Sequence, residues 1–187
     1  MTPTTETTDM QSLLAFARDR GACAEARLWL NTQTDPHVAW EMCERPDWMI
    51  WYARRRDVDP KVFVRIACDC ARTVLWLVPE GENRPRLAIE VAERRMRGEA
   101  TIDEVRDAAY AAEAAAADAE AAEAAAADAT YAAAYAAVYT AEAATYAAYV
   151  VDAAAEAAAA YAGTREQANI QMCQIIRTHL RYEDVAL

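Results

Sequence analysis

The chain has 187 residues, of which 55% are hydrophobic, and its formal net charge is −11 at pH 7. Alanine accounts for 48 residues, and 34 of these alanines lie within residues 107–162. Leu, Ile, Val and Phe together number only 30 residues. Such a low share of these residues, combined with a high net charge, usually indicates disorder. The rest of the chain nevertheless holds a normal supply of core-forming side chains. The composition therefore excludes a wholly disordered chain, a collagen-like chain and a disulfide-stapled scaffold.

The acidity belongs to the alanine-rich segment. Residues 107–164 carry nine acids and no base, whereas residues 1–106 carry 18 acids and 16 bases. The basic footprint of a nucleic-acid-binding protein is missing, so we expect no nucleic-acid partner. The sequence shows neither a signal peptide nor an uncharged run long enough to cross a membrane. The five cysteines are interpreted as reduced thiols, which are typical of the cytoplasm, so we expect a cytoplasmic protein. We also expect that it does not bind a membrane.

Helix start and stop signals divide the first part of the chain. A capping-box pattern beginning at Thr8 predicts a helix over residues 12–20, and Gly21 ends it. We expect residues 1–8 to be disordered and a second helix to cover residues 22–30.

Three prolines predict further helix starts. Asp35-Pro36 and Asp59-Pro60 each place a capping acid before a proline at the first helical position, and Pro46 opens another helix. From Pro60, apolar residues keep a period near 3.6, which indicates a core helix.

Asn83 is expected to cap a helix over residues 84–97, which Gly98 ends. Period-two alternation and hairpin turns are missing, so no strand is expected. Residues 9–98 are therefore predicted to form a helical domain.

The alanine-rich segment has clear signals at both ends. Thr101-x-x-Glu104 is a capping box, and Thr164-x-x-Gln167 opens a last helix after Gly163. Between Gly98 and Gly163 there is neither Gly nor Pro, and Ala has the highest helix propensity. The segment also contains a ten-residue repeat.

The predicted fold class is all-α. A compact multi-helix N-terminal region is followed by a very long Ala-rich helix, or an Ala-rich helical hairpin, over residues 101–162. A short C-terminal helix over residues 164–183 then packs back on the domain.

Tyrosines give this segment one aromatic face. At about 100° per residue, seven of them fall within an arc of about 120° on a continuous helix. Packing against the N-terminal helices is the favoured interpretation, and a partner-binding face is the alternative. The candidate partner-binding residues are Tyr131, Tyr135, Tyr139, Tyr146 and Tyr149.

No residue pattern defines a catalytic, cofactor or metal site. Cys68 and Cys70 are two positions apart, so a helix points them in opposite directions, and buried inert thiols are favoured. His37 and His179 stand beside no nucleophile motif, and a Gly-rich phosphate loop is missing. We therefore expect a protein that is not an enzyme and needs no cofactor.

The N-terminal part is rich in tryptophan. All five, Trp29, Trp40, Trp48, Trp51 and Trp76, lie in the first 80 residues. Core filling is the favoured interpretation, and an exposed binding hot spot is the alternative. For the run Arg54-Arg55-Arg56, a solvated helix end is favoured over an anion site.

Several motifs resemble a known family over residues 21–175. They are Cys43-Glu44-Arg45-Pro46-Asp47-Trp48, Cys68-Asp69-Cys70-Ala71-Arg72, Val78-Pro79-Glu80-Gly81-Glu82-Asn83-Arg84-Pro85 and Gly98-Glu99-Ala100-Thr101, followed by an Ala/Tyr tract. In this order they resemble the bacterial and phage family of Ala-rich, immunity-five-like putative immunity proteins. The resemblance implies a non-enzymatic protein that neutralises a toxin by occluding its surface.

Two other functions stay open at this point. The chain could be a phage or bacterial assembly protein whose Ala/Tyr helix forms a homo-oligomer. A more remote alternative is ice binding by the Ala-rich helix, although the threonines lack a regular 11-residue spacing.

Overall fold

The computed structural model describes residues 5–120, 128, 131–132, 143–162 and 164–187. Within these ranges every regular element is a helix and no strand occurs, which confirms the all-α prediction. The elements are α1 (Thr5–Asp19), α2 (Ala24–Leu30), α3 (Pro36–Met42), α4 (Pro46–Ala53), α5 (Pro60–Arg72), η1 (Leu75–Leu77), α6 (Arg84–Met96), α7 (Ile102–Glu120), α9 (Ala143–Ala162), α10 (Arg165–His179) and α11 (Tyr182–Val185).

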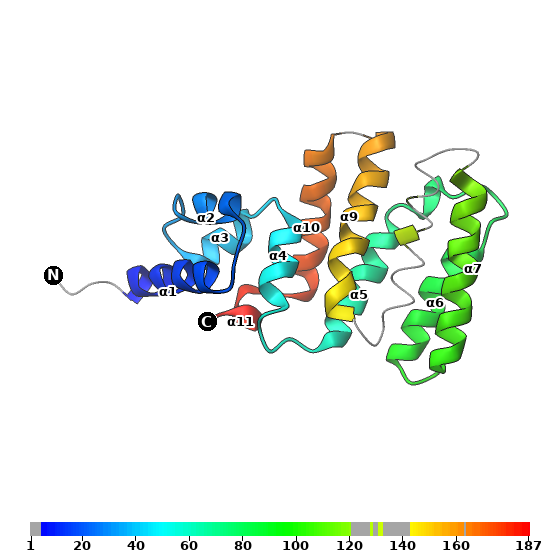
Figure 1. Ribbon diagram of the computed structural model, residues 1–187, viewed down its shortest axis with the longest axis horizontal. Helices are drawn as coiled ribbons and strands as arrows, with labels where there is room; N and C mark the ends of the chain where they lie inside the picture. The colour runs from blue at the N-terminus through cyan, green and yellow to red at the C-terminus, as the bar shows by residue number, and fades with distance from the viewer. Residues whose placement is uncertain (1–4, 121–127, 129–130, 133–142, 163) are drawn as a thin grey trace.

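Most helices stand side by side. In Figure 1, α4, α10, α9, α5, α6 and α7 have roughly parallel or antiparallel axes, while α1 lies across one end of this row. Helix α9 packs on α4, α5 and α10, and α7 packs on α6. None of the described helices is long and apolar enough to cross a membrane.

Helix α5 forms the centre of the core. It packs on α6, α9 and α10, so its side chains are covered from several directions. Phe63, Ile66, Cys68 and Cys70 are each at most 1% exposed. The apolar period in the sequence therefore predicted this core helix correctly.

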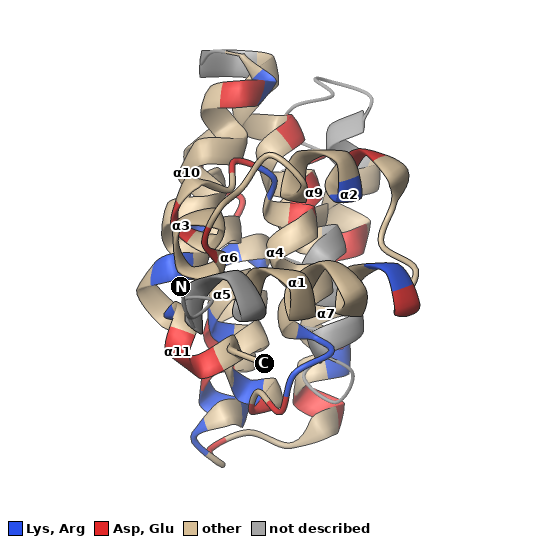
Figure 2. Ribbon diagram, turned by 90° about the vertical axis from the view of Figure 1, so that its left-hand side faces the viewer, with Lys and Arg blue, Asp and Glu red and all other residues tan. Residues whose placement is uncertain are grey.

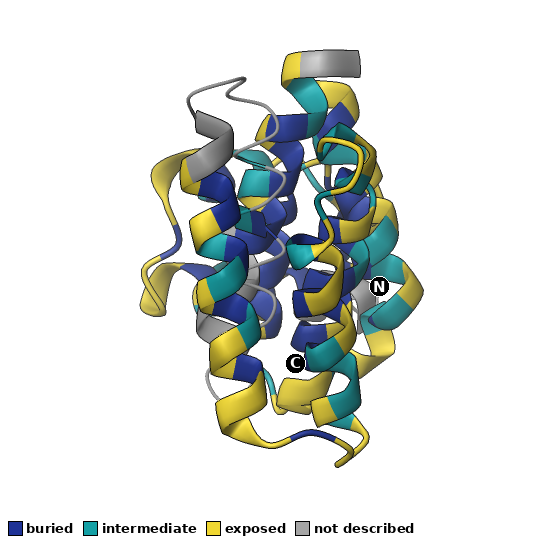
Figure 3. Cartoon of the chain, turned by 90° about the vertical axis from the view of Figure 1, so that its right-hand side faces the viewer, coloured by how far each residue is buried: buried dark blue, intermediate teal, exposed yellow. Residues whose placement is uncertain are grey.

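The alanine-rich helices bury stripes of small side chains. In α7 the fully covered positions are Val105, Ala109, Ala112 and Ala116, which recur every three or four residues. In α9 the covered positions are Val150, Val151, Ala154, Ala155 and Ala157. Figure 3 shows such buried positions, in dark blue, turned toward the inside of the helix row.

The predicted very long Ala-rich helix is wrong. Helices α7 and α9 occupy separate places in the row, with α6 and α5 between them, and so share no axis (Figure 1). A single projecting helix would leave most of its alanine surface in water, whereas packing buries it. The hairpin alternative depends on residues 121–142, most of which lie outside the described residues.

Most predicted caps are confirmed. Asp35 Oδ1 accepts a hydrogen bond from Val38 N at 2.8 Å, and Asp59 Oδ1 accepts one from Lys61 N at 2.9 Å. The capping boxes that begin at Thr101 and Thr164 both form.

One helix start and one capping side chain differ from the prediction. Helix α1 begins at Thr5, inside the stretch expected to be disordered, because no Gly or Pro interrupts residues 5–20 and early acids favour a helix N-terminus. At α6, Glu82 and not Asn83 accepts the hydrogen bond from Arg84 N, at 2.9 Å. The longer carboxylate side chain reaches the free amide and also pairs with the Arg84 guanidinium.

The C-terminal segment ties α3 to the helix row. Arg177 Nη2 donates to the carbonyl oxygens of Trp40 and Cys43, at 2.9 and 2.6 Å. Trp40 Nε1 donates in return to the Leu180 carbonyl at 3.3 Å. These bonds join residues more than 130 positions apart, and they fix the N-terminal helices against α10.

Candidate functional site

Helices α1 to α4, together with Tyr182, surround a cavity of about 410 Å³. Helix α4 supplies one wall. Trp51 and Tyr52 follow Trp48 by three and four positions, so they lie on the same face of the helix as Trp48. We call this space the aromatic cavity; its lining includes Leu13, Ala17, Ala26, Trp29, Ala39, Trp40, Trp48, Met49, Trp51, Tyr52 and Arg54.

Aromatic rings pack around the cavity in one tilted pair and one edge-on pair. The Trp29 and Trp48 ring centroids are 5.7 Å apart, and those of Phe16 and Tyr52 are 5.6 Å apart. Rings in these orientations attract one another beyond the burial of their area. Trp40 is buried in the core, as core filling predicts, while Trp48 and Trp51 stay half-buried at the cavity. A binding hot spot stays a prediction.

Two polar groups in the cavity wall have no hydrogen-bond partner within the described part of the chain. They are Trp48 Nε1 and Tyr52 Oη, and both atoms are closed off from solvent. Burial raises the pKa of Tyr52 to about 12, although nearby Arg56 opposes this shift. Buried donors in native proteins are nearly always paired, so the two groups mark a place where packing is incomplete.

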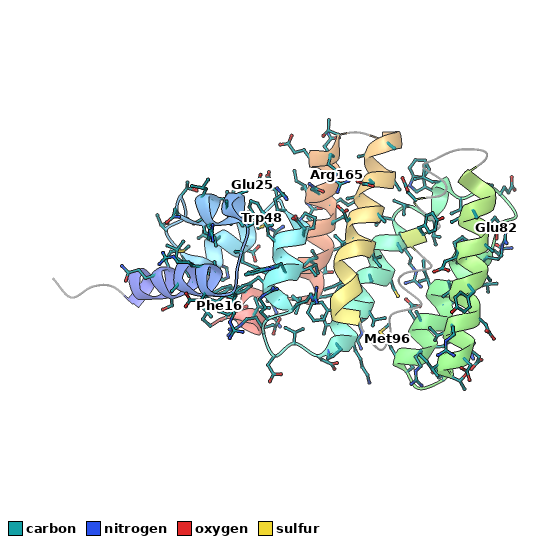
Figure 4. All side chains as sticks on the ribbon, viewed as in Figure 1. Phe16, Glu25, Trp48, Glu82, Met96 and Arg165 are labelled. Atoms are coloured by element: carbon teal, nitrogen blue, oxygen red, sulfur yellow. The ribbon has the colours of Figure 1, made fainter. Side chains whose placement is uncertain are left out.

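A shallower groove of about 340 Å³ lies beside the cavity, where α2, α4 and α10 meet. We call it the acidic groove; its lining is Glu25, Trp29, Met42, Glu44, Arg45, Trp48, Glu166 and Asn169. Trp29 and Trp48 belong to both linings, so the two spaces share a wall. In Figure 4, Glu25 and Trp48 lie at the end of the helix row near α4, and Arg165 lies at the upper end of α10.

Arg45 organises the acidic groove. Its guanidinium binds Asp47 through two hydrogen bonds of 3.0 and 2.9 Å, and it lies 3.1 Å from Glu25. The hydrogen bonds that Arg45 donates to the Asp47 carboxylate are the main reason that the pKa of Arg45 is raised. The Arg45 Cζ atom also lies 4.5 Å from the Trp48 ring centroid, a cation–π contact. Glu44 and Glu166 have no ion-pair partner among the described residues.

The cysteines lie where inert thiols are expected. Cys43, Cys68, Cys70 and Cys173 are buried, whereas Cys23 is exposed and its sulfur caps α2. Burial raises the pKa of Cys43 to about 11 and that of Cys68 and Cys173 to about 12, so these thiols stay protonated at neutral pH. Among the described residues, no group of His, Cys, Asp and Glu could hold a metal ion.

The two histidines form ion-pair contacts. His179 Nε2 lies 2.7 Å from Asp69 Oδ2, which links the end of α10 to α5. His37 is more exposed, and its Nε2 lies 3.7 Å from Glu183. Both have structural surroundings, in agreement with the sequence-based interpretation.

The candidate tyrosines are only partly described. Tyr131 is half-buried and helical, and Tyr146 and Tyr149 belong to α9, although their side chains lie outside the described part of the chain. Tyr135 and Tyr139 lie outside the described residues. Their role in partner binding therefore stays a prediction.

Sequence reasoning did not find the acidic groove. Its residues come from four elements, and α10 follows α2 by more than 130 positions. Local spacing cannot bring Glu25 and Glu166 together. The one available signal was the tryptophan-rich N-terminal part, where an exposed hot spot stayed open as an alternative.

Comparison with known proteins places the chain in a family. Residues 57–175, more than half of the chain, match the family model described as Imm-5 like putative immunity protein. No curated protein and no solved structure matches the chain. The matched residues cover α5 to α9 and most of α10, while the aromatic cavity lies outside them. The chain belongs to the Imm-5 like putative immunity protein family.

Proposed function

We propose that this protein binds a protein toxin through the acidic groove and neutralises it by covering part of the toxin's surface. The family match supports an immunity role of this general kind. The observation that carries the proposal is the groove itself, in which half-buried aromatic rings lie within an acidic rim.

This composition suits protein recognition. Interface centres are rich in aromatic residues and methionine, and polar residues surround them. Met42 is 62% exposed, so a partner's apolar side chain could cover it together with Trp29 and Trp48. Glu44 and Glu166 would then attract a lysine or arginine of the partner. We therefore expect the toxin segment to carry an apolar side chain flanked by basic residues.

The test uses any toxin candidate that the neighbouring genes encode. Co-expression should protect cells from the toxin, and size exclusion with light scattering should show a 1:1 complex. The variant E44K/E166K should weaken binding at least about tenfold, because like charges across an interface repel. The matched variant E80K/E90K reverses two exposed acids away from the groove and should bind normally.

The outcomes separate the function from its surface. If the wild-type protein neither binds nor protects, the immunity proposal is wrong. If it binds and E44K/E166K binds equally well, the toxin uses another surface.

The tyrosines identified in the sequence are the second candidate surface for the same function. Tyr110 on α7 is 61% exposed, so at least one tyrosine of the segment is available to a partner. Single Tyr-to-Ala changes at Tyr131, Tyr135, Tyr139, Tyr146 and Tyr149 keep a high helix propensity. Loss of toxin binding in these variants, with E44K/E166K normal, would favour the tyrosine surface.

The oligomeric assembly alternative has less support. The covered alanines of α7 and α9 are committed to packing within the chain. A stable homo-oligomer in the light-scattering experiment, without a toxin complex, would revive that alternative.

A further inference from the structure

Arginines gather where α1 and α4 end. Arg20 follows α1, and Arg55 and Arg56 follow α4. The Arg55 Cζ atom lies 3.9 Å from the Trp51 ring centroid, while Arg20 and Arg56 lie 5.7 and 5.6 Å from that of Phe16. Figure 2 faces this side of the molecule and shows its basic segments in blue.

This cluster is not neutralised by acids. Within the described part of the chain, Arg20, Arg55 and Arg56 have no carboxylate at ion-pair distance, whereas Arg45, Arg72 and Arg165 each pair with two acids. Partial burial lowers the pKa of Arg55, and the positive charges of Arg54 and Arg20 lower it further. The ends of α1 and α4 offset part of this repulsion, but only weakly and only over the last turn.

The cluster adjoins the aromatic cavity. Trp51, which carries the Arg55 guanidinium on its ring, lines the cavity, and so do Arg54 and Gly21, the neighbour of Arg20. The cavity lies in the size range of small-molecule sites, and most of its wall is apolar. An apolar space beside Arg20 and Arg55, which have no carboxylate at ion-pair distance among the described residues, complements a molecule that has an apolar body and one anionic group.

We propose that the aromatic cavity binds a small amphipathic carboxylate, with the apolar chain inside and the carboxylate between Arg20 and Arg55. Asp47 also lines the cavity, but two hydrogen bonds from Arg45 neutralise it, so it does not oppose the anion. The cavity lies outside the family-matched residues and shares only Trp29 and Trp48 with the acidic groove.

The test compares decanoate with decan-1-ol on the full-length protein. Tryptophan fluorescence reports binding, because four tryptophans line the cavity, and the melting temperature rises with any ligand that binds only the folded state. We expect decanoate to bind at least about tenfold more tightly than decan-1-ol, since only the carboxylate gains charge-assisted hydrogen bonds.

Variants test each part of the proposed site. R20Q/R55Q should lose about tenfold in decanoate affinity and leave decan-1-ol affinity unchanged. R65Q/R86Q removes the same charge from exposed positions elsewhere and should behave like the wild type. A26L fills the cavity and should weaken both ligands, whereas A160L, at an exposed position of α9, should weaken neither.

Three results would overturn the proposal. They are equal binding of decanoate and decan-1-ol, unchanged decanoate binding by R20Q/R55Q, and unchanged binding by A26L with a wild-type melting temperature. A further contrary result is loss of toxin binding by R20Q/R55Q when decanoate does not bind, since the cluster would then serve an acidic protein segment.

Discussion

Two regions of the molecule pack with side chains of very different size. Helices α1 to α4 use large aromatic side chains, whereas α7 and α9 use alanine. Around α4, tryptophans and a tyrosine hold the helices apart and leave a cavity of about 410 Å³. In α7 and α9, alanines are covered to 0% exposure against neighbouring helices. Small side chains let helix backbones approach closely, whereas large rings of fixed shape fill space unevenly.

The difference shows how one chain can separate stability from binding. The alanine helices pack on α5 and α6, and so complete the core. The aromatic region keeps half-buried rings, which a partner or ligand could cover, and two closed-off polar groups that have no hydrogen-bond partner in the described part of the chain. The following changes test this division, from the largest expected effect to the smallest.

Ile66→Ala should cost the most stability. Ile66 lies on the central helix α5 and is fully buried, so its removal should lower the unfolding free energy by about 2–5 kcal/mol. Leu13→Ala, beside the existing cavity, should cost nearer the lower end of that range, because less new empty space is created. Urea unfolding would measure both, and equal costs would contradict the division.

Enlarging alanines should have opposite effects in the two regions. Ala155→Leu in α9 should lower the unfolding free energy by about 1–3 kcal/mol, because that contact has no spare volume. Ala26→Leu fills part of the aromatic cavity and should raise the unfolding free energy by about 0.5–1 kcal/mol. Thermal unfolding of the two variants would show a sign difference, and destabilisation of both would mean that the cavity is not usable space.

Alkaline pH should destabilise the protein through its buried thiols. In the folded state the pKa of Cys68 is raised to about 12, whereas the ordinary value is 9.0. The unfolded chain therefore loses this proton first, so the stabilisation is complete below pH 9 and is lost as the pH rises toward 12.

The size of this effect can be measured on one residue. Cys68 contributes at most about 1.4 kcal/mol per pH unit in that range. Between pH 8, 9 and 10, the urea midpoint should fall less steeply in the Cys68→Ala variant than in the wild-type protein.

A second measurement tests the burial of the thiols. With Ellman's reagent at pH 8, only Cys23 of the folded protein should react, and rapid reaction of a second thiol would contradict the burial of the others.

Tyr52→Phe should give the smallest change. The Tyr52 hydroxyl is closed off and has no hydrogen-bond partner among the described residues, so its removal should leave the protein as stable or more stable by about 1 kcal/mol. Calorimetry would detect this gain. A loss above that size would show that the hydroxyl has a partner in solution.

Much of the fold could be predicted because its signals are local. Proline and a capping acid predicted the starts of α3 and α5, and the apolar period predicted that α5 is the core helix. Such signals act within one helical turn, so the sequence states them directly. The start of α6 shows the limit of this reasoning, since two adjacent polar residues could cap it and the longer one does.

The candidate site could not be predicted in the same way. Glu166 reaches the acidic groove only because α10 packs on α4, and Arg177 holds α3 there through the Trp40 carbonyl. Arg54 and Arg55 are exposed at the end of α4, as predicted for a solvated helix end, but the spacing did not show that Arg55 lies on the Trp51 ring beside a cavity. Contacts between residues this far apart leave no spacing in the sequence.

The sequence by itself determined that the chain is helical, where most helices begin, that Cys68 and Cys70 are buried thiols and which family it resembles. Only the tertiary structure decided where the alanine-rich helices lie. Alanine favours helix in any environment, so its propensity says nothing about helix length or neighbours. Helix length and neighbours depend on which surfaces can cover a stripe of small residues. Helix α5 supplies such a surface for α9, and α6 supplies one for α7. The same packing brings α2, α4 and α10 together around the acidic groove.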